Sequence, residues 1–169
     1  MIVSYRVIAW MPLIAVLLHL VEAFAWPGGF PAWYRAFRPD RAANVTTTVL
    51  GYVNAVLIVI AVLAGVLGSR PFGVAFWLIV ASIGACRAAW QAWATVKKNE
   101  YSPGVVTACA LYIPLAIFGF VHFARSGIVR PEVVLQAAVA GPAFHFFSEW
   151  YLGRLSRQRA TTPPPARPR

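Results

Sequence analysis

The chain has 169 residues, of which 60% are hydrophobic and only 12% are charged. Soluble domains carry about 25% charged residues, so this composition excludes an ordinary soluble domain and is typical of a polytopic membrane protein. The net charge of +10 does not indicate nucleic-acid binding, because the basic residues lie in short connections and in the tail rather than in a groove lined by aromatic residues.

Five apolar segments predict an all-α bundle with five transmembrane helices. They cover residues 6–26, 44–67, 71–96, 105–124 and 132–152. Each approaches the ~20 residues that cross the hydrocarbon layer of a bilayer, and none alternates as a barrel strand does. We expect one transmembrane domain over residues 1–153, followed by a basic, proline-rich tail over 154–169 that is disordered in the cytoplasm.

Lysine and arginine residues are unevenly divided between the two ends of this predicted bundle. One end collects ten of them: Arg35, Arg38, Arg41, Lys97, Lys98, Arg154, Arg157, Arg159, Arg167 and Arg169. The other end collects four: Arg6, Arg70, Arg125 and Arg130. Because cytoplasmic loops are enriched in basic residues, we expect the N-terminus outside and the C-terminus in the cytoplasm of a bacterial inner membrane.

Proline and glycine mark the ends and one interior point of these segments. The first segment stops at the sequence WPGGF, residues 26–30. Ser102 and Pro103 are expected to begin the fourth helix as N-cap and first-turn residue. Pro142 lies inside the fifth segment, where a missing backbone N–H predicts a kink or an opening toward a cavity.

Two carboxylates lie inside predicted membrane helices, and each follows a histidine by about one turn. His19 precedes Glu22 by three positions and His145 precedes Glu149 by four, so each pair shares a helix face. A charged side chain at the bilayer centre costs roughly 2.5–3.5 kcal/mol. We therefore expect both pairs to turn inward and meet in one polar pocket near the cytoplasmic leaflet.

Three further polar residues of the second and third segments are expected at the same depth. Arg87 is a candidate to orient Glu22 or an anionic headgroup, and Asn54 and Gln91 are candidates to supply hydrogen bonds to a substrate. A structural alternative stays open, in which Glu22 and Arg87 form an ion pair that holds helices together and Asn54 only packs between helices.

Two motifs carry a resemblance to a known family. HLVEAFAWPGGF, residues 19–30, resembles the signature of the HXXEE-domain family of small bacterial integral membrane proteins, and YSPGVVTA, residues 101–108, resembles its Tyr-x-Pro-Gly-x-x-Thr segment. HFFSEW, residues 145–150, resembles a late His/Glu helix of that family, and the similarity covers most of residues 15–150. Ala23 stands at the second glutamate of the motif, and RAAWQAW, residues 87–93, stands where a histidine is expected. The resemblance implies a polar membrane site and names no reaction.

The first functional hypothesis is an enzyme that acts on a lipid or isoprenoid-like substrate by acid–base chemistry, such as isomerisation or cyclisation. Glu22 and Glu149 are the candidate acid and base, with His19 and His145 as their partners. Aromatic residues near these positions are candidates to bind the substrate or to stabilise a cationic intermediate. They are Trp26, Trp90, Trp150 and Tyr101.

Two other hypotheses remain open at this point. His19, Glu22, His145 and Glu149 form a possible ligand set for a divalent metal such as Zn, Fe or Mn, although the first hypothesis needs no cofactor. The third hypothesis is a non-catalytic lipid-binding or transport-associated protein. The expected partners are membrane lipids and a hydrophobic small molecule, without nucleic acid, and the sequence specifies neither the substrate nor the oligomeric state.

Overall fold

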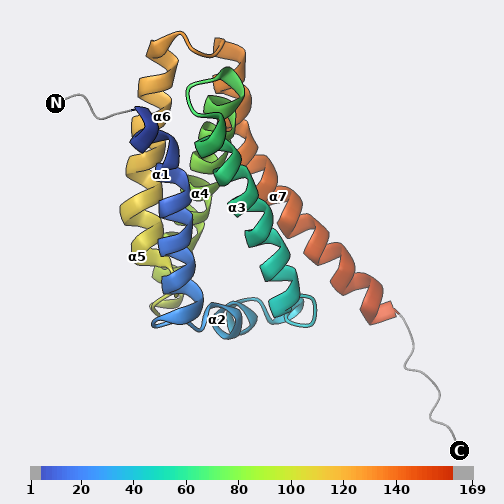
Figure 1. Cartoon of the computed structure of the whole chain (residues 1–169). Helices are drawn as coiled ribbons and strands as arrows, with labels where there is room; N and C mark the ends of the chain where they lie inside the picture. The colour runs from blue at the N-terminus through green and yellow to red at the C-terminus, as the bar shows by residue number, and fades with distance from the viewer. Residues whose placement is uncertain (1–4, 162–169) are drawn as a thin grey trace, which may run out of the picture.

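The computed structural model describes the backbone of residues 5–161 and the side chains of residues 5–154, which form a helical bundle (Figure 1). No strand occurs among these residues. In chain order the first elements are α1 (Tyr5–Leu20), the π-helical turn η1 (Val21–Ala25), α2 (Phe30–Phe37), the 3₁₀ turn η2 (Pro39–Arg41) and α3 (Thr47–Leu67). They are followed by α4 (Pro71–Lys98), α5 (Val105–Thr107), the π-helical turn η3 (Ala108–Tyr112), α6 (Ile113–Ser126) and α7 (Pro131–Thr161).

Four of the five predicted spans are confirmed by length and apolar composition. They are Tyr5–Ala25, Thr47–Leu67, Pro71–Lys98 and Val105–Ser126. The fifth segment lies in α7, which has 31 residues but is not among the spans found in the described part of the chain. Polar residues such as Glu132, His145 and Glu149 lower its hydropathy.

The predicted boundary between the transmembrane domain, residues 1–153, and the tail, residues 154–169, falls within α7. This helix continues without interruption to Thr161. The remainder of the predicted tail, residues 162–169, lies outside the described residues.

Helix α4 lies at the centre of the bundle and packs against α1, α3, α6 and α7 (Figure 1). Trp77 is fully buried, and its indole Nε1 donates to the Ile8 carbonyl of α1 at 2.8 Å. A Cβ added to Gly119 of α6 would lie 1.8 Å from the Trp77 ring, so only glycine permits this contact. Small residues at such crossings let membrane helices approach closely, which fixes the order of the helices around α4.

Helix α2 is short and amphipathic, and it lies across one end of the bundle (Figure 1). Its aromatic side chains pack inward on Trp90 of α4. Trp33 stacks on Phe37 with 5.3 Å between ring centroids, and Tyr34 lies 5.6 Å from Trp90. Together, Phe30, Trp33, Tyr34, Phe37 and Trp90 form an aromatic layer that closes this end.

Pro142 in α7 is accommodated by a hydrogen bond from α4. Proline has no N–H, so the Ala138 carbonyl loses the donor that position 142 normally supplies. Ser82 Oγ donates to this carbonyl at 2.9 Å and also accepts from the Gly141 N–H at 3.1 Å. Helix α7 runs continuously through Pro142, and the carbonyl that the proline leaves without a donor is satisfied by α4. The expected kink or opening toward a cavity stays a prediction.

We predict that Ser82→Ala lowers the free energy of unfolding in detergent micelles by about 1–2 kcal/mol, because it leaves the buried Ala138 carbonyl without a donor. In a Pro142→Ala background, residue 142 regains its N–H, and Ser82→Ala should cost clearly less. Denaturant titration of the four proteins of this double-mutant cycle measures the difference. Equal costs in the two backgrounds would contradict the pairing of Ser82 with the proline.

Candidate functional site

The first residues of the candidate site lie at the junction of α1 and the π-helical turn η1. His19 lies at the end of α1, and Glu22 lies inside η1. A second π-helical turn, η3, follows Thr107 and ends at Tyr112. Single π-helical turns inside α-helices are frequent at functional sites, because they redirect the side chains around them. Here they flank the point where the two sequence motifs meet.

Glu22 caps the N-terminus of the span Val105–Ser126. Its carboxylate accepts from the backbone N–H of Val106 at 3.1 Å and of Thr107 at 2.6 Å. The first N–H groups of a helix have no partner within the helix, and a carboxylate there is favoured by the helix dipole. The expected cap, Ser102, does not perform this role: Gly104 is the N-cap residue, and the buried Ser102 hydroxyl has no partner.

Two hydroxyl groups complete the coordination of the Glu22 carboxylate. The Thr107 hydroxyl donates to one oxygen and the Tyr101 hydroxyl donates to the other. Burial, together with the hydrogen bond to Glu22 and its negative charge, raises the pKa of Tyr101 to about 12. Tyr101 therefore stays protonated at neutral pH and acts as a donor. With all these donors around it, Glu22 is held as an anion in a fixed position.

His19 is fully buried and is held by the same loop. Its Nδ1 lies 3.1 Å from the Gly104 carbonyl oxygen. A carbonyl only accepts, so Nδ1 carries the proton and Nε2 of the neutral ring is a bare acceptor. Nε2 has no hydrogen-bond partner among the described residues. The structure thus fixes the ring at Nδ1 and leaves the buried Nε2 without a partner among the described residues.

The backbone conformation and the close packing at position 104 explain why this residue is a glycine. Its φ is +96°, and an added Cβ would lie 2.7 Å from His19 Cε1 and 3.2 Å from Ala23 Cβ. Ala23 is fully buried, and it occupies the position of the second glutamate of the motif. At this contact a small side chain lets the loop approach η1 closely.

Other buried polar groups surround His19. The Tyr112 ring lies 5.2 Å from the His19 ring, and its fully buried hydroxyl has no partner. Gln91 donates to the Pro103 carbonyl at 3.1 Å, while its Oε1 is unpartnered. Arg87, which donates from Nη1 to Asn54 Oδ1 at 3.1 Å, lies within electrostatic reach of both rings. We call His19, Arg87, Gln91 and Tyr112 the polar cluster.

Glu149 belongs to a different group of residues. Its carboxylate accepts from the Tyr34 hydroxyl at 2.9 Å and from Arg38 Nη1 at 3.0 Å, and it also pairs with Arg41. Arg38 and Arg41 pair in addition with Asp40, whose pKa is lowered chiefly by the hydrogen bond from Arg38. Burial first, and then the charge of Glu149, raise the pKa of Tyr34 above its usual value. This ion-pair cluster fastens α2 and η2 to α7.

These contacts correct the expectation of one shared pocket. Glu22 and Glu149 have no hydrogen-bond partner in common. Helix α7 diverges from α1 toward the end of the bundle where α2 lies, and Glu149 pairs there with Arg38 and Arg41 (Figure 1). The structural alternative, an ion pair of Glu22 with Arg87, is not found among the described residues, where Arg87 donates to Asn54. His145 lies 6.1 Å from the Trp90 ring, beside the aromatic layer and apart from His19.

The possible metal ligand set is not assembled either. Among the residues that the structure describes, no three or more His, Cys, Asp or Glu side chains come together in an arrangement that could hold a metal ion. His19 and Glu22 face the loop before α5, whereas His145 and Glu149 face α4 and α2. The four residues named as possible ligands are therefore split between two places.

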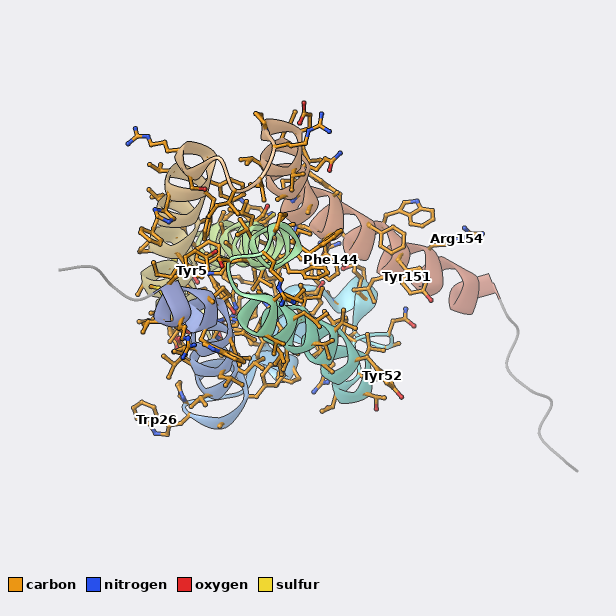
Figure 2. The ribbon with its side chains drawn as sticks, turned by 45° about the horizontal axis from the view of Figure 1, so that its top comes forward. Tyr5, Trp26, Tyr52, Phe144, Tyr151 and Arg154 are labelled. Atoms are coloured by element: carbon orange, nitrogen blue, oxygen red, sulfur yellow. The ribbon has the colours of Figure 1, made fainter. Side chains whose placement is uncertain are left out.

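The aromatic residues expected around the substrate are also dispersed. Trp26 is 80% exposed and points away from the bundle (Figure 2). Trp150 is 52% exposed, and the Arg154 guanidinium lies over its ring. Trp90 belongs to the aromatic layer, and the Tyr101 hydroxyl bonds to Glu22.

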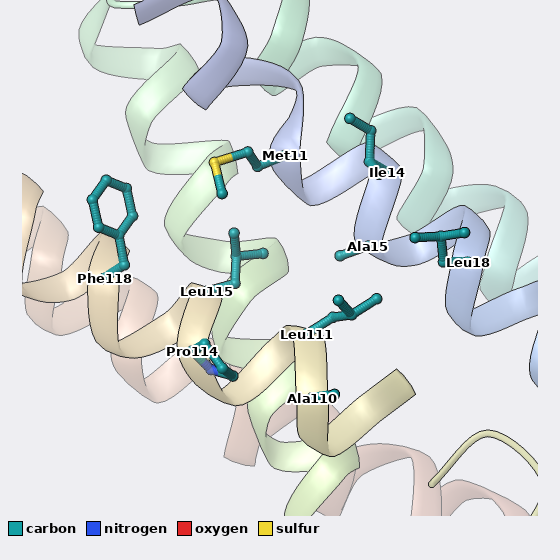
Figure 3. Close-up of a pocket in the computed structure, with 9 residues that line it drawn as sticks. All are labelled: Met11, Ile14, Ala15, Leu18, Ala110, Leu111, Pro114, Leu115 and Phe118. Carbon is teal, nitrogen blue, oxygen red and sulfur yellow. The ribbon is translucent and has the colours of Figure 1, made fainter. Parts of the chain in front are cut away.

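An apolar groove of about 460 Å³ runs between α1 and the segment formed by η3 and α6 (Figure 3). Ala15 lines this groove and lies one turn before His19 on the same face of α1. The groove is lined by Met11, Ile14, Ala15, Leu18, Ala110, Leu111, Pro114, Leu115 and Phe118.

Residues 10–119 match the family model described as "Protein of unknown function with HXXEE motif". The chain therefore belongs to the HXXEE family. The matched range contains His19, Glu22, Arg87 and Thr107, whereas His145 and Glu149 lie beyond it. No curated protein and no solved structure matches the chain.

We predict that Glu22→Gln lowers the free energy of unfolding in detergent by about 2 kcal/mol, because the amide loses the charge that strengthens four hydrogen bonds. The matched control is Glu132→Gln, since the Glu132 carboxylate is exposed and its partner Arg130 is exposed as well. The control should change stability by less than about 0.5 kcal/mol. Equal effects of the two substitutions, measured by denaturant titration, would rule out the capping role of Glu22.

We predict that a double-mutant cycle of Arg41→Gln and Glu149→Gln gives a coupling energy of about 1 kcal/mol that decreases with salt. The reason is that both side chains are largely shielded, with 13% and 20% exposure. The pair Arg130–Glu132 serves as the exposed reference and should show coupling near zero. A coupling of Arg41 with Glu149 no larger than that reference would refute a role of this pair in fastening α2 to α7.

Proposed function

We propose that this member of the HXXEE family is an integral membrane enzyme that acts on a lipid or isoprenoid-like substrate by acid–base chemistry. In this proposal His19 transfers the proton, and Glu22 positions it. The observation that carries the proposal is the fully buried Nε2 of His19, which has no partner while Nδ1 is fixed by the Gly104 carbonyl. A hydrogen-bonded Nδ1 and a free Nε2 are the usual arrangement of a histidine that works as a general base.

The surrounding groups suit proton transfer on a bound molecule. Nε2 accepts a proton from the substrate, and the resulting imidazolium keeps its Nδ1–H bond to Gly104. The unpartnered Tyr112 hydroxyl, next to the His19 ring, is available to donate to the atom that gains electron density. Glu22 is a positioning residue here, because its bonds to Val106 and Thr107 hold the loop that carries Gly104. Glu149 has no catalytic role in this scheme.

A hydrophobic substrate is supported by the apolar groove that Ala15, one turn before His19, helps to line. Its volume of about 460 Å³ falls within the ~300–1,000 Å³ of small-molecule pockets, and its lining is apolar. Because the groove lies between two spans, a hydrocarbon chain enters it from the bilayer without first crossing water.

We further propose that α7 is a fifth span, with the N-terminus outside and the C-terminus in the cytoplasm of a bacterial inner membrane. At 1.5 Å per residue, its 31 residues are about 46 Å long. Apolar side chains along it are exposed, including Leu135, Val139 and Phe146. The end of the bundle that holds α2 carries the greater number of basic residues, as a cytoplasmic end does.

The test compares lipid extracts of membranes that contain the wild-type chain, His19→Asn or no copy, after growth in D₂O. Asparagine places an N–H where His Nδ1 lies and removes Nε2, so the bond to Gly104 is kept while the base is lost. We predict that the wild type forms a lipid product, or a deuterium-labelled lipid, that is absent without the chain. With His19→Asn this product should appear 10²–10⁴-fold more slowly. Mass spectrometry measures both.

His122→Asn is the matched control, because His122 lies in α6 and stacks on Phe118, away from Gly104. It should behave as the wild type does. Equal product with His19→Asn, in a protein that elutes and melts normally, would show that Nε2 is not the base. An unchanged lipid extract with the wild type would favour the non-catalytic lipid-binding alternative.

A further inference from the structure

Arg87 carries a positive charge inside the bundle, in the third of the four apolar spans. Its guanidinium lies over the Phe30 ring, with 5.6 Å from Cζ to the ring centroid, and Nη1 donates to Asn54 Oδ1. Asn54 is itself oriented, because its Nδ2 donates to the Leu50 carbonyl at 2.9 Å. One edge of the guanidinium is thus fixed by a neutral amide.

No carboxylate among the described residues is paired with this charge. The sequence has only five acidic residues. Glu22 is engaged by the loop before α5, and Asp40 and Glu149 pair with Arg38 and Arg41. Glu132 pairs with Arg130, and Glu100 is exposed beyond the end of α4. Residues 1–4 and 155–169, whose side chains are not described, contain neither aspartate nor glutamate.

An arginine in this situation favours an external anion. A charged residue inside a span is costly unless it is paired, and such residues mark substrate or ion sites. The planar guanidinium offers parallel N–H donors that match the oxygens of a phosphate or a carboxylate. The hydrogen bond that the structure gives for the Arg87 guanidinium is the one from Nη1 to Asn54 Oδ1, which leaves further N–H donors for an anion.

We propose that Arg87, held by Asn54 and Phe30, binds the phosphate or carboxylate group of an amphiphilic ligand. This inference rests on the proposed function in one respect, namely that the ligand is the substrate of the enzyme. The reacting atoms of this substrate would then lie toward His19 and Tyr112. Arg87 lies one turn after Gly84 and one turn before Gln91 on α4. A Cβ at Gly84 would touch the Tyr112 ring, and His19 Cε1 and Gln91 Nε2 both lie against Gly104. His19 and Tyr112 both present polar atoms without a partner among the described residues. The ligand class is therefore an anionic amphiphile, with its anionic group at α4 and its reactive part in the polar cluster.

The test measures the thermal unfolding of the full-length protein in micelles of a zwitterionic detergent. The probes are dodecyl phosphate, laurate, dodecanol and inorganic phosphate. A ligand that binds only the folded state raises the melting temperature with its concentration, so each titration gives an apparent Kd. We expect dodecyl phosphate or laurate to bind at least 10-fold more tightly than dodecanol, which has the same chain without the charge.

Three variants assign this preference to Arg87. Arg87→Gln should abolish the preference for the anionic probes, and Arg87→Lys should retain part of it. Arg70→Gln, in which an exposed arginine at the start of the same helix is replaced, should keep it fully. A preference that survives Arg87→Gln, or that is absent from the wild type, would overturn the proposal.

Further measurements separate an anion site from a structural role of Arg87. Because Arg87→Gln removes a buried charge without a carboxylate partner, the melting temperature without ligand should stay unchanged or rise. A lower melting temperature would show a structural role and overturn the anion site. Protection by inorganic phosphate as strong as that by dodecyl phosphate would place a free anion there and overturn the amphiphile. His19→Asn should keep the preference for the anionic probes, so loss of product together with retained binding separates the failure of one proposal from that of the other.

Discussion

The structure depends on one carboxylate that satisfies the start of a membrane helix. The first N–H groups of the span Val105–Ser126 have no acceptor within their own helix. Glu22 supplies the acceptor, and its partner Thr107 lies 85 positions along the chain. His19 adds a second bond across the same distance, from Nδ1 to the Gly104 carbonyl. An unsatisfied backbone group costs several kcal/mol in a bilayer, so these bonds fix how α1 and η1 pack against the start of the span Val105–Ser126.

The charged residues divide into two electrostatic environments. At the end of the bundle closed by α2, arginines and carboxylates are matched in a compact ion-pair cluster around Glu149. Around His19 the charges are not paired with each other. The Glu22 carboxylate is surrounded by neutral donors, and Arg87 has the neutral amide of Asn54 as its partner. The first arrangement stabilises the fold, and the second leaves polar groups available to a ligand. This contrast separates the structural carboxylate, Glu149, from the region that we propose is functional.

Much of the fold could be predicted from the sequence, because apolar length and the position of Pro and Gly act locally. Four spans and the turn at residues 26–30 follow from those signals. The pairing of polar residues could not be derived in this way, since helix spacing places His19 with Glu22 and His145 with Glu149 but does not say what each pair faces. The contacts depend on the divergence of α7 and on the loop before α5, which are tertiary features.

Some missed residues did have a signal in the sequence. Gly104 and Thr107 belong to the segment that resembles the family motif, and their joint presence with His19 and Glu22 is explained by direct contact. Phe30 likewise ends the segment 19–30 that resembles the family motif. Tyr112 had no comparable signal, because one more tyrosine among so many aromatic residues does not stand out. The role of Ala23 also needed the structure, which shows it packed near Gly104 with no exposed surface.

The two π-helical turns, Val21–Ala25 and Ala108–Tyr112, have a consequence for how this chain tolerates change in length. A π-helical turn holds one residue more than the α-helical turn it replaces. Removing the extra residue would restore regular winding and leave the helix beyond the turn in nearly the same phase, whereas removing one residue from a regular α-helical stretch rotates everything beyond it by about 100°. The side chains that such a deletion would redirect are those inside the turn, such as Glu22 in one and Tyr112 in the other. Each π-helical turn is therefore a place where the chain can change in length without rotating the rest of its helix.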